Sequence, residues 1–239
     1  LTAAKIYFQS KCFYFWNVFI KNHKTTINCK GKLIDLSSPI VMGIINTTPD
    51  SFYDGGKNNS IEKATAQAEK HISEGAAIID IGGYSSRPGA NEVNELEEID
   101  RVIPVIESIL KRFPDAIISI DTFRGNVAKK AIKAGAAIIN DISAGDIDPT
   151  MLDTVIELNV PYIMMHMQGS PETMQDKPTY KNIIQEITYY FSKKINYLRK
   201  NGVNDIIIDP GFGFGKTLEH NYEMLGKLNH FQLLDMPVL

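Results

Sequence analysis

The chain has 239 residues, of which 44% are hydrophobic and 22% are charged, so it is neither intrinsically disordered nor a coiled coil. Its 25 Lys and Arg against 28 Asp and Glu give a net charge of −3, which provides no broad basic surface and argues against nucleic acid as a partner. The two cysteines, Cys12 and Cys29, form neither a C-x-x-C pair nor a disulfide framework. This composition fits a globular protein of a reducing compartment, and we expect a cytoplasmic location.

Residues 1–25 need separate treatment because CFYFWNVFI, from Cys12 to Ile20, resembles the apolar core of a signal peptide. The run is too short to cross a bilayer, no small-residue cleavage site follows it, and the chain opens with Leu1 rather than Met. We interpret residues 1–25 as an N-terminal extension whose authenticity the sequence leaves open, and residues 26–239 as the folded domain. We expect no membrane partner, although a short element on a membrane surface is the alternative for the extension.

Strand-like and helical patterns alternate from Thr26 onward. The segments TINCK and KLIDL flank Gly31, which predicts a β-hairpin. Six apolar runs follow, and each ends in polar or glycine residues and precedes a stretch of helical periodicity. The runs cover residues 40–45, 77–81, 116–121, 137–142, 162–166 and 205–209. Because such strands are apolar on both faces, the pattern indicates a buried parallel sheet with helical connections.

An internal repeat supports this order of elements, since GAAIIDI begins at Gly75 and GAAIIND begins at Gly135, 60 residues further on. One other strand lies between them, so the period is about 30 residues, which suits one strand, its connection and one helix. Six such units outnumber the strands of five-stranded doubly wound folds, and no G-x-G-x-x-G follows the first strand. The predicted fold class is therefore α/β, a TIM (β/α)8 barrel preceded by a β-hairpin.

The predicted barrel is incomplete. A helix is expected near residues 218–230, and the MPVL that ends the chain resembles the start of a seventh strand. Because a closed barrel of this type needs eight strands, we expect this chain to contain strands one to six and the start of strand seven, and to be truncated at its C-terminal end.

Polar side chains follow the predicted strands, at the end of a TIM barrel where active sites lie. At any single position such a side chain could simply cap a helix or a turn. Carboxylate or carboxamide groups at the ends of strands one, three, four and six would nevertheless meet at the mouth of the barrel, the opening formed by the carboxyl ends of the strands. Local capping does not explain such a meeting. These residues are Asn46, Asp121, Asn140 with Asp141, and Asp209, while strand two ends in Asp80 and strand five in His166.

The glycine-rich segment GFGFGKT, residues 211–217, does not match a phosphate-binding loop. The G-x-x-x-x-G-K-[ST] pattern requires glycine where this chain has Pro210. We expect the glycines instead to allow a tight loop that presents Phe212 and Phe214 to a flat ligand.

The six strand ends carry, in chain order, the segments NTTPDSFYDGG, IDIGGYSSRPGA, ISIDT, INDIS, MMHMQG and IDPGFGFGKT. Together they resemble the signature loops of the dihydropteroate synthase family, from about Thr26 to Leu239. The resemblance implies a TIM-barrel transferase of folate synthesis, a sulfonamide target, that condenses 6-hydroxymethyl-7,8-dihydropterin diphosphate with 4-aminobenzoate, releases pyrophosphate and uses Mg²⁺. It implies small-molecule partners, and a homodimer of the full-length form is an option that the sequence leaves open.

The resemblance assigns pterin-binding roles to Asp121, Asn140 and Asp209. These residue types fit, because the edge of a pterin presents N–H donors that a carboxylate accepts and that a carboxamide can also pair with. Ile142 and Met165 would contact the faces of the pterin ring, although ordinary core packing explains both equally well. Contacts beside the aminobenzoate are implied for Phe52, Ser86, Arg87, Pro88 and Phe214.

Asn46 is the implied Mg²⁺ ligand, and a single carboxamide oxygen suits a hard ion that takes its other ligands from diphosphate and water. Ser86 and Arg87 would contact the diphosphate. No protein nucleophile is needed, because the pterin can spread the positive charge that develops as pyrophosphate leaves. We expect the catalytic residues to be Arg87, which neutralises the leaving group, and Asp121 with Asp209, which favour a cationic pterin intermediate.

Several features depart from the family pattern. Ser86 stands where many relatives carry Thr, Tyr84 replaces an acidic residue, and the family's Ser-Arg-Lys and Arg-x-His motifs lie beyond Leu239. Two alternatives therefore stay open: a pterin-dependent methyltransferase, which NTTPDSF and SSRPGA argue against, and a non-catalytic pterin-binding barrel, which the missing motifs allow. His166 lies among methionines, so we expect a structural histidine rather than a general base.

Overall fold

The computed structural model describes residues 25–47, 56–84, 93–169, 173–174 and 178–239. The described part begins with the predicted hairpin, in which β1 (Thr26–Cys29) pairs antiparallel with β2 (Lys32–Asp35). Lys30 and Gly31 between the strands have φ values of 53° and 88°. Two successive positive φ values match the turn of a two-residue hairpin, where the second position favours glycine.

Six parallel strands form the sheet, and each strand pairs with the next one in the chain. Their bounds are β3 (Met42–Asn46), β4 (Ile78–Gly82), β5 (Ile118–Asp121), β6 (Ile138–Asp141), β7 (Tyr162–Met165) and β8 (Ile206–Asp209). Beside β8, the chain end continues the sheet: Ile208 N donates to Pro237 O (3.0 Å) and Leu239 N donates to Ile208 O (2.9 Å). Val238 forms a parallel bridge with Ile208, which confirms the predicted start of a seventh strand.

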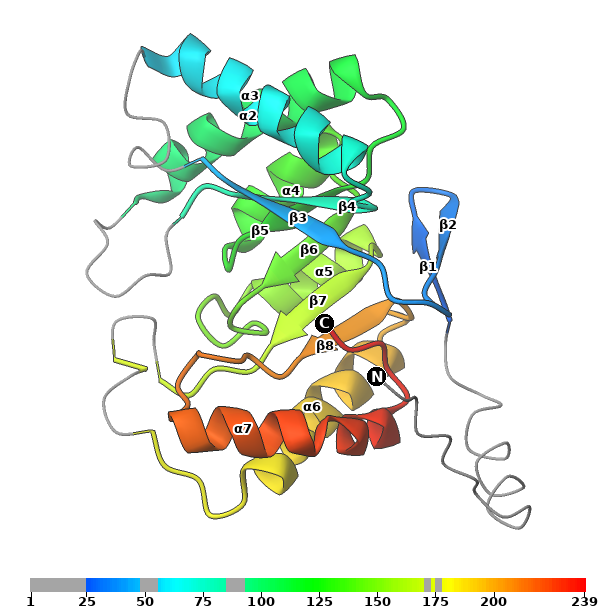
Figure 1. Ribbon diagram of the computed structural model, residues 1–239, viewed down its shortest axis with the longest axis vertical. Helices are drawn as coiled ribbons and strands as arrows, with labels where there is room; N and C mark the ends of the chain where they lie inside the picture. Colours follow the sequence, from blue (N-terminus) through cyan, green and yellow to red (C-terminus); the bar gives the residue numbers. More distant parts are fainter. Residues whose placement is uncertain (1–24, 48–55, 85–92, 170–172, 175–177) are drawn as a thin grey trace, which may run out of the picture.

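A helix follows each of the six strands, as the repeat predicts. The helices are α2 (Gly56–Ser73), α3 (Glu95–Arg112), α4 (Gly125–Ala134), α5 (Met151–Leu158), α6 (Ile183–Lys200) and α7 (Leu218–Gly226). In the view of Figure 1, α2 and α3 lie above the sheet and α6 and α7 lie below it. The single helix expected over 218–230 is divided, because α7 ends at Gly226, a poor helix former, and a 3-10 helix, η2 (Leu228–Leu234), follows.

Two apolar clusters hold these layers together. The larger one joins one face of the sheet to the helices. In the smaller one, Ile27 and Ile34 of the hairpin pack against Ile78, Ile138 and Ile207 on the other face, near the first residues of the strands. The hairpin therefore covers the barrel interior at the amino ends of the strands, and the carboxyl ends lie at the opposite end of the molecule (Figure 1).

This arrangement is a partial TIM barrel preceded by a β-hairpin, as the sequence predicts. Residues 1–24, which make up nearly all of the predicted extension, lie outside the described part of the chain. Among the described helices, none has the length and apolar character needed to cross a membrane.

Candidate active site

Polar side chains from four neighbouring strands end at one level of the sheet. Asn46, Gly82, Asp121 and Asn140 are successive register partners on β3 to β6. Register partners of parallel strands point to the same face, here the barrel interior. A Cβ placed on Gly82 would lie 3.2 Å from Asp121 Oδ2 and 3.4 Å from Asn46 Oδ1. The carboxylate and the carboxamide thus approach each other across a position that glycine keeps open.

The same face continues onto β7 and β8. Asn140 is the partner of Ile163, Met165 lies two residues further along β7, and Met165 is the partner of Asp209. Because residues two apart in a strand share a face, Met165 and Asp209 also point into the barrel. The structure therefore brings together Asn46, Asp121, Asn140, Met165 and Asp209, five of the residues that the sequence singles out.

The carboxylates of this mouth are destabilised as anions. Burial and the nearby charges of Asp80, Glu98 and Asp141 raise the pKa of Asp121 well above its usual value. Burial also raises the pKa of Asp209, although the Gly211 N–H, which donates to Asp209 Oδ1 (2.8 Å), opposes the shift. A site that gathers buried acidic groups in this way favours a ligand that brings N–H donors or positive charge.

One expected mouth residue, Asp141, lies on the other face. Side chains alternate along a strand, so Asp141 points toward the helices when Asn140 points into the barrel. Its carboxylate accepts from Ser143 N (2.8 Å), Gly145 N (2.7 Å) and the Tyr162 hydroxyl (2.8 Å). Asp141 therefore stabilises the turn after β6 and has no place in the mouth.

Asp80, one layer below the mouth, is a polar residue whose role the sequence does not reveal. Its side chain is 2% exposed, and its Oδ2 accepts from Asn140 Nδ2 (3.1 Å). Burial raises the pKa of Asp80, while the hydrogen bond from Asn140 acts in the opposite direction. The internal repeat could have drawn attention to Asp80, because Asp80 and Asn140 occupy the same position of its two copies.

Lys216 is a second residue whose role the sequence does not predict. Its side chain is 4% exposed and its Nζ donates to His166 O (3.0 Å) and Phe214 O (2.8 Å). Burial lowers the pKa of Lys216 to about 7, although the charge of Asp209 acts in the opposite direction. The ammonium thus joins the segments after β7 and β8 close to Asp209. The sequence feature that could have indicated this role is a single lysine in the glycine-rich segment 211–217.

His166 contacts Lys216 and aromatic rings rather than the mouth. Its Nδ1 lies 3.2 Å from Lys216 Nζ, and its ring packs edge-on against Tyr190 at 4.9 Å between centroids. Burial, and then the charge of Lys216, lower the pKa of His166 to about 3. A neutral, enclosed imidazole agrees with the expected structural role.

Comparison with known proteins identifies the family. The family model described as pterin binding enzyme matches residues 42–239. The dihydropteroate synthase of Haemophilus influenzae is 47% identical over 210 residues, covering 87% of this chain and 76% of the relative. Solved dihydropteroate synthases from Xanthomonas albilineans, with 4-aminobenzoic acid, and Yersinia pestis, with a sulfonamide drug, both give a TM-score of 0.82. They are 40% and 43% identical, covering 90% and 89% of this chain and 76% and 78% of theirs.

The chain belongs to the dihydropteroate synthase family of pterin-binding enzymes. Several residues that the family resemblance implicates, Phe52, Ser86, Arg87 and Pro88, lie outside the described residues. Two arginines donate hydrogen bonds to the backbone on either side of residues 85–92. Arg101 Nη1 donates to Gly83 O (3.1 Å) and Arg124 Nη2 donates to Val93 O (2.8 Å), while Arg124 also pairs with the buried Glu98.

The remaining residues implied by the dihydropteroate synthase resemblance lie near the strand ends. Ile142, directly after β6, is 9% exposed, and Met165 is 2% exposed. Phe214 is partly exposed in the loop after β8, and its backbone N–H donates to Gly211 O (3.1 Å). Phe212 in the same loop is 37% exposed, so both rings are accessible to a ligand.

The donor set at Asn46 suits the Mg²⁺ implied for dihydropteroate synthases. Asn46 Oδ1 and Asp121 Oδ2 are hard oxygen donors on either side of Gly82. Within the part of the chain that the structure describes, no group of three or more His, Cys, Asp or Glu side chains could hold a metal ion. The residues present therefore fit an ion that takes most of its ligands from substrate and water, and not a metal enclosed by protein.

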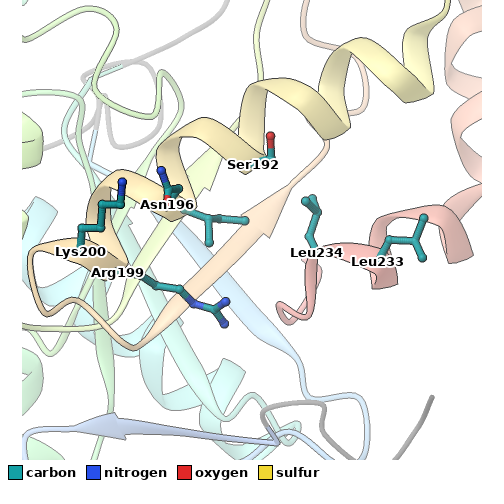
Figure 2. Close-up of a pocket in the computed structure, with 7 residues that line it drawn as sticks. Ser192, Asn196, Arg199, Lys200, Leu233 and Leu234 are labelled. Carbon is teal, nitrogen blue, oxygen red and sulfur yellow. The ribbon is translucent and has the colours of Figure 1, made fainter. Parts of the chain in front are cut away.

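A cavity of about 470 Å³ lies away from the mouth, between α6 and η2. Ser192, Asn196, Arg199 and Lys200 of α6 line it together with Leu233 and Leu234 of η2, and Figure 2 shows these side chains. Because α6 runs from the carboxyl end of β7 back to the start of β8, its last turns lie near the amino ends of the strands. This cavity is therefore separate from the candidate active site.

Proposed function

We propose that this chain catalyses the dihydropteroate synthase reaction, in which 6-hydroxymethyl-7,8-dihydropterin diphosphate and 4-aminobenzoate give 7,8-dihydropteroate and pyrophosphate. The observation that carries the proposal is the position of Asp121, Asn140 and Asp209 on one interior face at the carboxyl ends of β5, β6 and β8. Family membership and the solved relative with 4-aminobenzoic acid support the same reaction.

Binding of the pterin follows from the chemistry of these groups. The 2-amino-4-oxo edge of a pterin presents N–H donors, and the carboxylates of Asp121 and Asp209 can accept them. The pKa of both acids is raised. Donation of N–H groups to them therefore offsets the burial that destabilises both anions and, at Asp121, the repulsion from nearby carboxylates. Met165 would pack against the ring from β7, where its side chain is buried.

Substitution at the methylene carbon needs charge stabilisation rather than a protein nucleophile. The bond to diphosphate oxygen breaks and the bond to the aminobenzoate nitrogen forms, and the nitrogen loses a proton. Asp121 and Asp209 would stabilise the positive charge that develops on the pterin. Asn46 would hold Mg²⁺, which when bound supplies positive charge beside the diphosphate. Ser86 and Arg87 keep their proposed diphosphate contacts, and Phe52, Pro88 and Phe214 their proposed contacts with the aminobenzoate.

Two further assignments belong to this proposal. Residues 26–239 form the catalytic domain and residues 1–25 are an extension from it. The protein acts in the cytoplasm on small-molecule substrates.

The test is a product assay with the two substrates and Mg²⁺. We expect 7,8-dihydropteroate and pyrophosphate in equal amounts, with activity lost in Asp209→Asn and retained in Asp153→Asn, which changes an exposed residue of α5. Pterin binding without product would favour the non-catalytic barrel. Methyl transfer from methyltetrahydrofolate to a corrinoid would favour the methyltransferase. Either result would overturn the proposed reaction.

A further inference from the structure

A buried carboxyl group lies directly beneath the polar mouth. Asp80 is the register partner of Ile44 on β3 and of Ser119 on β5, and it shares their interior face. Asp80 lies two residues before Gly82, so it occupies the layer below Asn46 and Asp121. With 2% of its surface exposed, Asp80 does not reach a ligand in the mouth. Its influence on a ligand must pass through another side chain.

Asn140 is that side chain. Asn140 Nδ2 donates to Asp80 Oδ2 over 3.1 Å, and both residues are buried. Only the nitrogen end of a carboxamide can donate to a carboxylate, so the carboxylate selects which end of Asn140 faces it. The Oδ1 of Asn140, at the other end of the planar amide, is then directed away from Asp80 as an acceptor. Without Asp80, the amide could turn over and present its N–H groups instead.

Asp80 Oδ1 forms no hydrogen bond with the described residues that would give Asp80 a different role. Among the described residues, Asp80 Oδ1 and Ser119 Oγ are buried side-chain atoms without a hydrogen-bond partner. An unpaired buried oxygen is costly, so a carboxyl group kept only for stability would be better replaced by an apolar side chain. The hydrogen bond that Asp80 accepts thus comes from Asn140, a residue of the ligand site.

We propose that Asp80 is a positioning residue that fixes the amide of Asn140 with its oxygen toward the mouth, and thereby selects a heterocycle that presents an amino donor there. This inference rests on the proposed pterin site and adds a source of specificity to it. A pterin, which carries a 2-amino group, meets an acceptor at Asn140. Lumazine, which carries an oxygen at that position, meets acceptor against acceptor and is rejected.

The experiment compares the affinities of pterin and lumazine by calorimetric titration into the chain and its variants. Wild type is expected to prefer pterin. Asp80→Leu, similar in size but unable to accept, frees the amide of Asn140 and lowers the ratio of the two affinities about tenfold or more. Asp80→Asn, which retains an oxygen that can accept from Asn140, preserves most of the preference. A ratio of two affinities does not change when a variant merely loses part of its folded fraction.

Ser119→Ala is the matched control, because it changes the neighbouring buried group and leaves the hydrogen bond between Asp80 and Asn140 in place. Asp80→Ala, which only removes atoms, replaces Asp80→Leu if the leucine variant does not melt cooperatively. An unchanged ratio in the leucine or alanine variant overturns the inference, as does an equal fall in Ser119→Ala. If wild type binds neither compound, the proposed pterin site itself is wrong, which is a separate result.

Discussion

The acidic residues of the mouth reduce the stability of the fold in exchange for binding capacity. Asp121 has a pKa raised by burial first and then by the charges of Asp80, Glu98 and Asp141. In the unfolded chain the same carboxyl ionises near its ordinary pKa of 3.8. The protonated Asp121 carboxyl therefore contributes its full stability to the folded protein below pH 3.8, and this contribution is lost as the pH rises through the pKa of the folded state.

Replacing Asp121 with Asn should accordingly stabilise the protein at neutral pH. The amide keeps the shape of the side chain and removes the buried charge, so we expect a gain of about 1 kcal/mol, or about 2 to 4 °C in Tm, at pH 7. The gain should disappear below about pH 3, where the Asp121 carboxyl is largely protonated in both the folded and the unfolded chain. Thermal melts at the two pH values measure this. A lower Tm for the variant at pH 7 would contradict the sign.

Asp209 should be needed for pterin binding. Asp209→Ala removes an acceptor from a buried edge and leaves ligand N–H groups unpaired, so the binding free energy should weaken by about 2 to 5 kcal/mol. Calorimetric titration of a pterin into the two proteins measures the loss, with Asp153→Ala on the exposed face of α5 as the control. An unchanged dissociation constant would remove Asp209 from the site.

At the scale of elements, the loop after β8 depends on close approach to the segment after β7. Gly211 and Gly213 have φ values of 73° and 82°. A Cβ on Gly211 would lie 2.1 Å from His166 O, whereas a Cβ on Gly213 would meet nothing within 4 Å. Alanine substitutions at the two positions therefore distinguish the effect of backbone strain from the effect of a clash with the neighbouring loop.

We expect Gly213→Ala to cost about 1 to 2 kcal/mol, the strain of a left-handed residue. Gly211→Ala adds a collision with backbone that cannot yield easily, so its cost should exceed about 3 kcal/mol. It should also weaken pterin binding, because Asp209 lies two residues away and accepts from the Gly211 N–H. Urea unfolding and pterin titration of both variants test the difference. Equal losses would show that the approach to His166 O is unimportant.

The strands are predictable from sequence because each is a short, mainly apolar run between polar or glycine residues. Burial on both faces holds for β4 to β8, whereas Ile44 of β3 is 55% exposed. The same property hides which side of a strand enters the barrel, so Asp141 is expected in the mouth but lies among the helices. The position of Asn140 beside Asp121 follows from the register of β5 and β6, whereas the repeat at Gly75 and Gly135 relates β4 to β6. The contacts of Lys216 depend on two loops meeting, and no local pattern encodes such a meeting.

In the whole molecule, the apolar packing that stabilises the barrel and the polar groups proposed to bind the pterin lie at opposite ends of the strands. At the amino ends of the strands the interior is filled by isoleucines and covered by the hairpin. At the carboxyl ends the interior is lined by Asn46, Asp121, Asn140 and Asp209. Between them lie Asp80 and Ser119, register partners that stand two residues before Gly82 and Asp121. Changes at the hairpin should therefore alter stability without altering the chemistry of the mouth.

Ile27 and Leu33 allow that separation to be tested within one hairpin. Ile27 is 1% exposed and packs in the isoleucine cluster, whereas Leu33 is 69% exposed. Ile27→Ala leaves a cavity beneath the barrel, so the free energy of unfolding should fall by about 2 to 4 kcal/mol, while Leu33→Ala should change it by less than about 0.5 kcal/mol. Chemical denaturation measures both. Pterin affinity of the folded Ile27→Ala protein should equal that of wild type, because the cavity lies at the end of the strands opposite to Asp209. A weaker affinity in this variant alone would mean that the hairpin supports the mouth through the layers of the barrel, and the two ends would then have to be treated as one coupled unit.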